Sequence, residues 1–214
     1  MAIDAVIYDF GGVFIDSPFT AVVDQAQQRG IDPMFMLHSV FGPYDQDTDH
    51  PWHRLERGEV TFDAARAAIM ELSSADGGPA LDPIDLLMAL GGGGVREQVV
   101  EHCRKLRTSG LRTGLLTNNA AEFAEMWRPL LPLEELFDDV VDSCEVGMRK
   151  PDARIFELAL ERLGTEADRT LFVDDAPGNI AGAEAVGLRT VLVGPRPQDV
   201  PDALARIDRS ISAA

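Results

Sequence analysis

Short apolar runs that end in polar residues constrain the fold of this chain more than any other feature. Five such runs occur, at residues 5–8, 113–117, 140–141, 170–174 and 190–193. Runs that are short and apolar on both faces are typical of buried strands in a parallel sheet. Helical patterns separate the later runs, at residues 96–107, 120–130, 152–163 and 179–186. This alternation predicts an α/β fold, a Rossmann-like parallel sheet covered by helices on both faces.

Residues 19–90 interrupt the alternation with a block of predicted helices. Pro and Gly residues divide the block into segments near residues 20–29, 33–41, 52–57, 62–72 and 83–90, with a loop at residues 73–79. Four glycines at residues 91–94 form a joint, either a hinge or a simple linker. We therefore predict an all-helical cap domain at residues 17–93, inserted into a core formed by residues 1–16 and 94–214. One weak helix is expected after Pro201.

The chain is strongly acidic, and its charge excludes several classes of partner. It has 19 basic and 36 acidic residues, a net charge of −17, which disfavours nucleic acid and anionic membrane surfaces. No apolar run approaches the ~18 residues of a membrane span, and the first residues lack the pattern of a signal peptide. Two cysteines are too few for a disulfide framework, so we expect a cytoplasmic protein. An anionic substrate would need local positive charge in its binding site.

Polar residues at the ends of the predicted strands mark the candidate site. Ligands of open parallel sheets bind beyond the carboxyl ends of the strands. The residues expected there are Asp9, Thr117, Asn118, Asp174 and Asp175, together with Lys150 before a predicted helix. Carboxylates that converge need a cation to offset their repulsion, and oxygen ligands suit Mg²⁺. The pattern therefore predicts a magnesium site beside a lysine.

These residues lie in segments whose order resembles the four motifs of the haloacid dehalogenase superfamily of hydrolases. The segments are residues 9–13, residues 117–118, Lys150 and residues 172–175. Residues 147–152 and 174–179 are similar to the branch that contains the phosphatase domain of soluble epoxide hydrolases. The resemblance covers residues 1–16 and 94–200. It implies a Rossmann-like core with an inserted helical cap.

The resemblance also implies a role for each of these residues. Asp9 would be the nucleophile that attacks phosphorus and forms an aspartyl phosphate. Thr117 would donate a hydrogen bond to the phosphoryl oxygens, and Lys150 would neutralise the transferred group. Backbone N–H groups would complete the phosphate site, those of Phe10, Gly11, Gly12 and Asn118. The ligands of Mg²⁺ would be Asp9, the carbonyl oxygen of Gly11, Asp174 and Asp175.

One position departs from the family pattern and leaves the function open. Phosphatases of the family usually carry a second aspartate two residues after the nucleophile, where this chain has Gly11. That residue serves as general acid and base, a contribution of about 10²- to 10⁴-fold in rate. Asp16 is a weak candidate to replace it. We therefore expect a Mg²⁺-dependent phosphatase for a small phosphorylated metabolite, either slow or suited to a good leaving group.

Two other functions remain open, as does the oligomeric state, with a homodimer among the options. A catalytically weak relative would bind a phosphorylated ligand and serve regulation. A 2-haloacid dehalogenase also lacks the second aspartate, but it works without metal and has no need for Asp174 and Asp175.

Each candidate residue also has a purely structural interpretation. Asp9 and Thr117 can cap chain elements, and Lys150 can be a solvated loop residue. Asp174 and Asp175 can cap a helix near Pro177 while they bind a metal. Asn179 either orients Lys150 or has a structural role. Trp52, His53 and Arg54 either pack in the cap or touch the substrate. We expect His38 to pack within an apolar helix.

Overall fold

A five-stranded parallel sheet forms the centre of the protein. The computed structural model describes residues 2–90 and 94–212. The strands are β1 (Ala5–Tyr8), β2 (Arg112–Thr117), β3 (Asp139–Asp142), β4 (Thr170–Asp174) and β5 (Arg189–Leu192). Their order in the sheet is β3-β2-β1-β4-β5, and all pairs are parallel. The predicted α/β fold is confirmed, and β1 lies in the middle, between β2 and β4.

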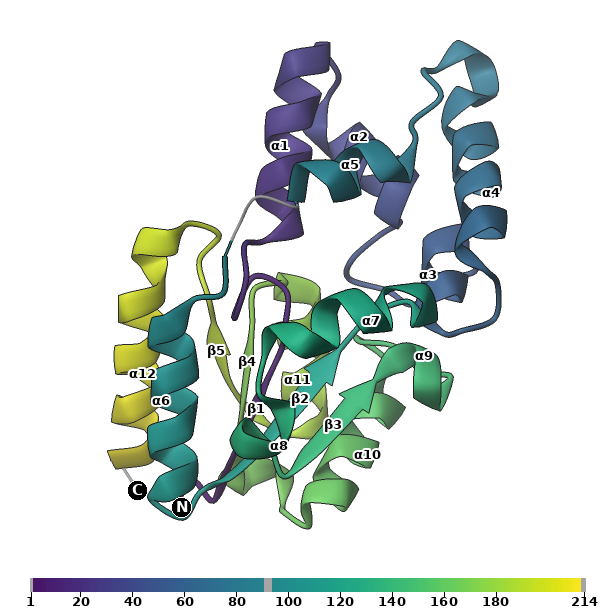
Figure 1. The fold of residues 1–214 in the computed structure, drawn as a ribbon. Helices are drawn as coiled ribbons and strands as arrows, with labels where there is room; N and C mark the ends of the chain where they lie inside the picture. The colour runs from purple at the N-terminus through teal and green to yellow at the C-terminus, as the bar shows by residue number, and fades with distance from the viewer. Residues whose placement is uncertain (1, 91–93, 213–214) are drawn as a thin grey trace.

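Helices cover both faces of this sheet, as the apolar runs predict (Figure 1). Within β1, Val6 and Tyr8 belong to the apolar cluster on one face, while Ile7 belongs to the cluster on the other. The first face is covered by α6 (Glu97–Thr108) and α12 (Val200–Ser212). The second is covered by α10 (Ala153–Leu163) and α11 (Pro177–Val186). Both faces of the sheet are therefore buried, and the carboxyl ends of the strands are left uncovered by these helices.

The predicted helical block forms a cap above those strand ends (Figure 1). Its helices are α1 (Pro18–Arg29), α2 (Pro33–Phe41), α3 (Pro51–Glu56), α4 (Phe62–Ser74) and α5 (Pro83–Leu90). They have an apolar core of their own that includes Val22, Met36 and Ile69. Ser17, Asp32 and Thr61 accept backbone N–H groups at the starts of α1, α2 and α4. The exact domain boundaries stay a prediction, and the glycine joint falls mostly on residues 91–93, outside the described part.

Several local predictions differ from the structure. Residues 120–130 form three short turns instead of one helix: η2 (Ala121–Phe123), α7 (Ala124–Trp127) and η3 (Arg128–Leu130). Pro129 has no N–H to continue an α-helix, which explains why regular hydrogen bonding stops there. The predicted loop at residues 73–79 is partly helical, because α4 extends to Ser74 and η1 (Ala75–Gly77) follows.

The end of the chain is more regular than expected. Instead of a weak helix, α12 buries Val200, Ala203 and Ile207 along one face against the sheet and α6. The remaining short elements are α8 (Leu133–Leu136), α9 (Ser143–Val146), η4 (Ala167–Arg169) and η5 (Pro197–Asp199). Within residues 2–90 and 94–212, no helix has the length and apolar character needed to cross a membrane.

Candidate active site

A cleft of about 180 Å³ lies between the strand ends and the cap. The core contributes residues that the sequence analysis assigned to the site, among them Asp9, Gly11, Thr117, Asn118, Lys150 and Asp175. The cap contributes Phe19, Tyr44, Trp52, Glu56 and Leu87. The structure thus brings most of the predicted site residues together in one cleft, whereas Asp174 and Gly12 do not line it, and the cap adds a second wall.

Lys150 connects two of the predicted acids. Its Nζ lies 2.7 Å from Oδ1 of Asp9 and 2.7 Å from Oδ2 of Asp174, and the side chain is only 1% exposed. Asn118 holds the lysine backbone, because its Oδ1 accepts the Lys150 N–H at 2.8 Å and its Nδ2 donates to the Lys150 carbonyl at 3.0 Å. Lys150 is therefore not a solvated loop residue. Sequence reasoning missed this use of the Asn118 side chain, having assigned only its backbone N–H.

Three carboxylates lie close to one another, two of them in contact with the lysine, and together they can hold a cation. One oxygen from each of Asp9, Asp174 and Asp175 lies within 4.8 Å of the others. Asp175 accepts a 2.5 Å hydrogen bond from the Ser17 hydroxyl at the base of the cap. Asp174 accepts hydrogen bonds from the backbone N–H of Ala176 at 2.7 Å and from Asn179 at 3.1 Å. Asn179 therefore orients Asp174 directly, and it reaches Lys150 only through that carboxylate.

The protonation of these groups shows that one lysine does not balance the acids. Burial raises the pKa of Asp9 to about 7, even though the nearby Lys150 ammonium lowers it. Burial and the charges of Asp174 and Asp9 raise the pKa of Asp175 well above its usual value. Burial lowers the pKa of Lys150, but Asp174 and Asp9 raise it more, so the lysine stays charged. A divalent cation with oxygen ligands fits this excess of negative charge.

Two glycines in the loop after β1 differ in whether another residue could take their place. Gly12 has a φ of +67°, and a Cβ there would lie 2.0 Å from the Asp175 carboxylate, so no other residue fits. At Gly11, a Cβ would meet only the Pro18 side chain at 3.9 Å. The position two residues after Asp9 therefore has room for a side chain. The preceding Phe10 is buried, with its ring centroid 5.1 Å from that of Trp127.

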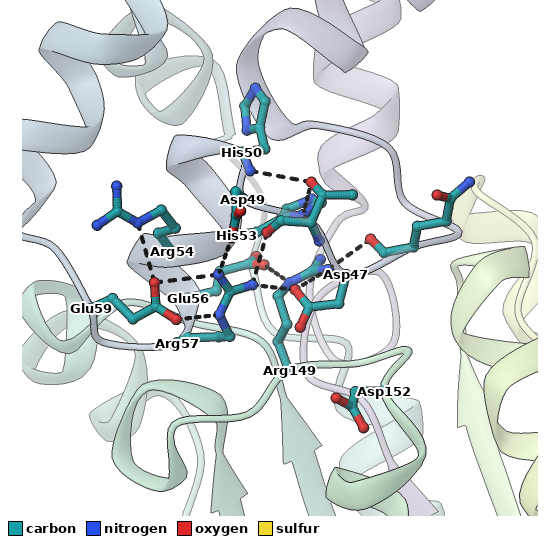
Figure 2. Close-up of polar contacts among 12 residues, drawn as sticks. Asp47, Asp49, His50, His53, Arg54, Glu56, Arg57, Glu59, Arg149 and Asp152 are labelled. Carbon is teal, nitrogen blue, oxygen red and sulfur yellow. Dashed lines mark hydrogen bonds and ion pairs between the residues drawn. The ribbon is translucent and has the colours of Figure 1, made fainter.

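An ion pair joins the core to the cap at Glu56, which lines the cleft, and we call it the cap–core clasp. Arg149, next to Lys150 in sequence, donates from Nε to Glu56 at 2.7 Å and from Nη1 to the Gln46 carbonyl at 3.2 Å. The Trp52 indole donates to the other oxygen of Glu56 at 2.9 Å. Figure 2 shows Arg149 reaching from the core toward Glu56 and Asp47 of the cap. The two adjacent basic residues in an acidic chain were the signal that could have revealed the clasp.

Two glycines allow the cap backbone to touch the core backbone near this clasp. A Cβ at Gly178, in α11, would lie 2.3 Å from the Tyr44 carbonyl oxygen. A Cβ at Gly58, after α3, would lie 2.6 Å from the carbonyl oxygen of Cys144 in α9. The α2–α3 part of the cap is therefore seated on the core at two places, which holds Tyr44, Trp52 and Glu56 in the cleft.

The remaining candidates separate into cleft residues and residues elsewhere. Asp16 lines the cleft but pairs with Arg96 at 3.4 Å. Trp52 also lines the cleft, whereas Arg54 pairs with Glu59 on the surface. The predicted packing of His38 is wrong, because this residue is exposed on α2; its helix buries Met36 and Val40 instead.

Comparison with known proteins places the chain in a family. The model for haloacid dehalogenase-like hydrolases matches residues 3–187. Acyl-CoA dehydrogenase family member 10 of Mus musculus is 31% identical over 88% of this chain and 18% of that protein. Bifunctional epoxide hydrolase 2 of Sus scrofa is 27% identical over 98% of this chain and 39% of that protein. The chain spans less than half the length of these curated relatives.

Solved structures share the fold. A predicted haloacid dehalogenase-like hydrolase from Porphyromonas gingivalis is 25% identical, with a TM-score of 0.66 and coverage of 98% of this chain and 99% of that chain. A family enzyme from Bacteroides thetaiotaomicron, in complex with magnesium and inorganic phosphate, is 22% identical, with a TM-score of 0.59 and coverage of 89% and 94%. Since the family model matches most of its length, this chain belongs to the haloacid dehalogenase-like hydrolases.

Proposed function

We propose that this hydrolase is a Mg²⁺-dependent phosphatase that acts on a small phosphate monoester through an aspartyl phosphate. One observation carries the proposal: the Lys150 ammonium lies 2.7 Å from both Asp9 and Asp174 at the bottom of a capped cleft. A carboxylate beside a buried cation is well placed to attack an anionic phosphoryl group, because the cation offsets the repulsion between them.

The polar residues assigned to the site each have a part in this reaction. Asp9 attacks phosphorus and forms the aspartyl phosphate, which water later hydrolyses. Lys150 keeps Asp9 oriented and neutralises the transferred group, and the Thr117 hydroxyl donates a hydrogen bond to its oxygens. Asp9, Asp174, Asp175 and the Gly11 carbonyl would hold Mg²⁺. When bound, the metal supplies positive charge between the acids and the phosphate.

Related proteins support the same reaction. Glyceraldehyde 3-phosphate phosphatase of Methanothermobacter thermautotrophicus is 37% identical over 41% of this chain. The Bacteroides thetaiotaomicron enzyme of the same fold binds magnesium and inorganic phosphate. The acidic cluster favours this function over metal-free dehalogenation, which does not need a third carboxylate beside Asp9 and Asp174 to hold a cation.

Turnover of 4-nitrophenyl phosphate in Mg²⁺ and in EDTA tests the proposal. We expect metal-dependent turnover that Asp9→Asn abolishes. Asp4→Asn is the matched control, because Asp4 pairs with Arg169 outside the cleft. No turnover over a panel of sugar, nucleotide and acyl phosphates would contradict the proposal and favour a phospho-ligand-binding protein. Metal-free chloride release from 2-chloropropionate would instead indicate a dehalogenase.

A further inference from the structure

The reaction proposed above lacks a proton donor for the leaving group, because Gly11 has no side chain. An alcohol that leaves as a bare alkoxide is a poor leaving group, and a positioned acid is worth about 10²- to 10⁴-fold in rate. The space above Gly11 is open, since a Cβ there would meet only Pro18 at 3.9 Å. A donor can therefore reach the leaving oxygen from the opposite side of the cleft, which is the cap.

Most polar side chains that line the cleft are already occupied. Both oxygens of Glu56 accept hydrogen bonds, from Trp52 and from Arg149, as Figure 2 shows for the arginine. The other engaged groups are Asp16 with Arg96, Lys150 with two acids, and Asn179 with Asp174. Asn119 also lines the cleft, but an amide can only donate a hydrogen bond and does not release a proton.

Tyr44 is different, because its hydroxyl is available. The residue lines the cleft, and none of the residues 2–90 and 94–212 is hydrogen-bonded to its hydroxyl. Its ring is fixed by aromatic packing, with centroids 4.6 Å from Phe19 and 6.2 Å from Phe41. Its carbonyl oxygen sits against Gly178, three positions after the Asp175 carboxylate. The cap thus places a tyrosine with a fixed ring in the lining of the cleft, across from the core residues.

The surroundings keep this phenol protonated. Burial, and next the carboxylate of Glu56, raise the pKa of Tyr44 well above 10, while Arg149 lowers it less. The hydroxyl is thus a donor at neutral pH, and an alkoxide is basic enough to take its proton.

We propose that Tyr44, from the cap, is the catalytic residue that donates a proton to the leaving-group oxygen in place of the aspartate that Gly11 replaces. In the first step Asp9 forms a bond to phosphorus, the ester P–O bond breaks, and the proton of Tyr44 passes to the departing oxygen. In the second step water attacks the aspartyl phosphate and returns a proton to the Tyr44 phenolate. The products are the alcohol, inorganic phosphate and the restored Asp9 carboxylate. This inference rests on the proposed phosphatase function.

A leaving-group series tests the role of Tyr44. Tyr44→Phe keeps the ring that packs on Phe19 and Phe41 and removes only the hydroxyl. We expect it to lower kcat for butyl phosphate by about 10²-fold, because butoxide needs the proton, and to lower kcat for phenyl phosphate by less, because phenolate is a weaker base than the Tyr44 phenolate. For 4-nitrophenyl phosphate the loss should stay below about 3-fold, since 4-nitrophenolate leaves without protonation. Inorganic phosphate should bind both proteins equally in Mg²⁺, as measured by thermal shift.

Two further variants make the result decisive. Tyr8→Phe is the control, because Tyr8 is the other tyrosine and its buried hydroxyl lies in the apolar cluster beneath α6 and α12. Gly11→Asp in the Tyr44→Phe background should restore turnover of butyl phosphate, since it supplies an acid from the core side. Equal losses across the series, or no loss, would overturn the role of Tyr44. Absence of turnover in the unaltered protein would instead reject the phosphatase itself.

Discussion

Lys150 and Arg149 are neighbours in sequence, and both are 1% exposed, yet they serve opposite halves of the cleft. Lys150 turns into the core and contacts Asp9 and Asp174 at the strand ends. Arg149 turns into the cap and contacts Glu56, with Asp47 3.7 Å away. One short turn after β3 and α9 therefore carries both the lysine that contacts the carboxylates of the core and the arginine that contacts the cap.

The two basic residues differ in what their charges do. Lys150 balances carboxylates that would otherwise repel an anionic substrate, so its charge acts on the reaction. Arg149 balances the carboxylates of Glu56 and Asp47 in the cap, so its charge acts on how the cap is held against the core. A buried ion pair contributes little net stability, but removal of one partner leaves an uncompensated charge that is costly. The predictions below separate these two roles.

Lys150→Met should have the largest effect, and that effect should fall on catalysis. The variant leaves Asp9 and Asp174 without their shared cation, so phosphoryl transfer loses its main fixed positive charge. We expect kcat/KM to fall by about 10³-fold, as measured with 4-nitrophenyl phosphate in saturating Mg²⁺. Arg154→Met is the control, because Arg154 pairs with Asp152 on the surface. A loss below tenfold would show that Lys150 is structural.

Arg149→Met should act mainly on stability. It leaves the buried Glu56 carboxylate unpaired, which should lower the free energy of unfolding by about 3 kcal/mol. Urea denaturation measures the change, and the double variant Arg149→Met with Glu56→Leu should recover most of it. The Trp52 indole, which donates to Glu56, should become more accessible to acrylamide in the single variant. If Arg149→Met and Lys150→Met lower kcat equally, the division of roles is wrong.

His53 should make the cap sensitive to acid. Its ring is 0% exposed, and its Nδ1 accepts from the Thr48 N–H at 3.0 Å. Burial, followed by the charge of Arg149, lowers the pKa of His53 from 6.5 to about 3. The unfolded chain therefore binds the proton first, so this stability is present above pH 6.5 and is lost as the pH falls toward 3. Between pH 8 and pH 5 the loss should be about 2 kcal/mol.

Urea denaturation in EDTA at both pH values measures the His53 contribution as the difference in pH dependence between the parent protein and His53→Asn. His53→Asn should remove it, while His38→Asn on the exposed side of α2 should not. Asp9 in the core has the opposite effect on stability. Its pKa is raised to about 7, so the folded protein binds the proton first and gains stability as the pH falls. If His53→Asn unfolds with the same pH dependence as the parent protein, acid sensitivity does not arise in the cap.

Mg²⁺ should stabilise the core by a smaller amount. A metal present at ten times its Kd adds about 1.4 kcal/mol to the free energy of unfolding. Thermal unfolding with Mg²⁺ and with EDTA measures the shift, which Asp175→Asn should reduce, because it removes one of three clustered carboxylates. Asp202→Asn on α12 is the control. An unchanged shift in Asp175→Asn would place the metal elsewhere.

The core half of the site was largely predictable from sequence. Asp9 and Asp174 lie at strand ends, and parallel strands bring their ends to one edge, so the convergence of these acids follows from the strand pattern alone. The predicted strands match β1 to β5 within a residue or two. Lys150 was expected in the same crevice because it precedes a predicted helix, but no local pattern indicates its place between Asp9 and Asp174.

The cap half was not predictable in the same way. Glu56 and Arg149 are 93 positions apart, and no spacing rule connects residues from an inserted domain with a loop of the core. The Tyr44 hydroxyl and the Ser17 contact with Asp175 likewise depend on how the cap is seated. Even within the core, the Asn118 side chain holds Lys150 only because two loops meet.

By itself, the sequence determined the α/β fold, the helical insertion and the acids at the strand ends, because apolar periodicity and strand direction are local properties. Only the tertiary structure decided which side chains face those acids. Contacts between Tyr44 and Gly178, or Glu56 and Arg149, arise when two separately folded apolar cores come together. The geometry of that docking depends on the packing of both surfaces, so the sequence of neither segment alone predicts it.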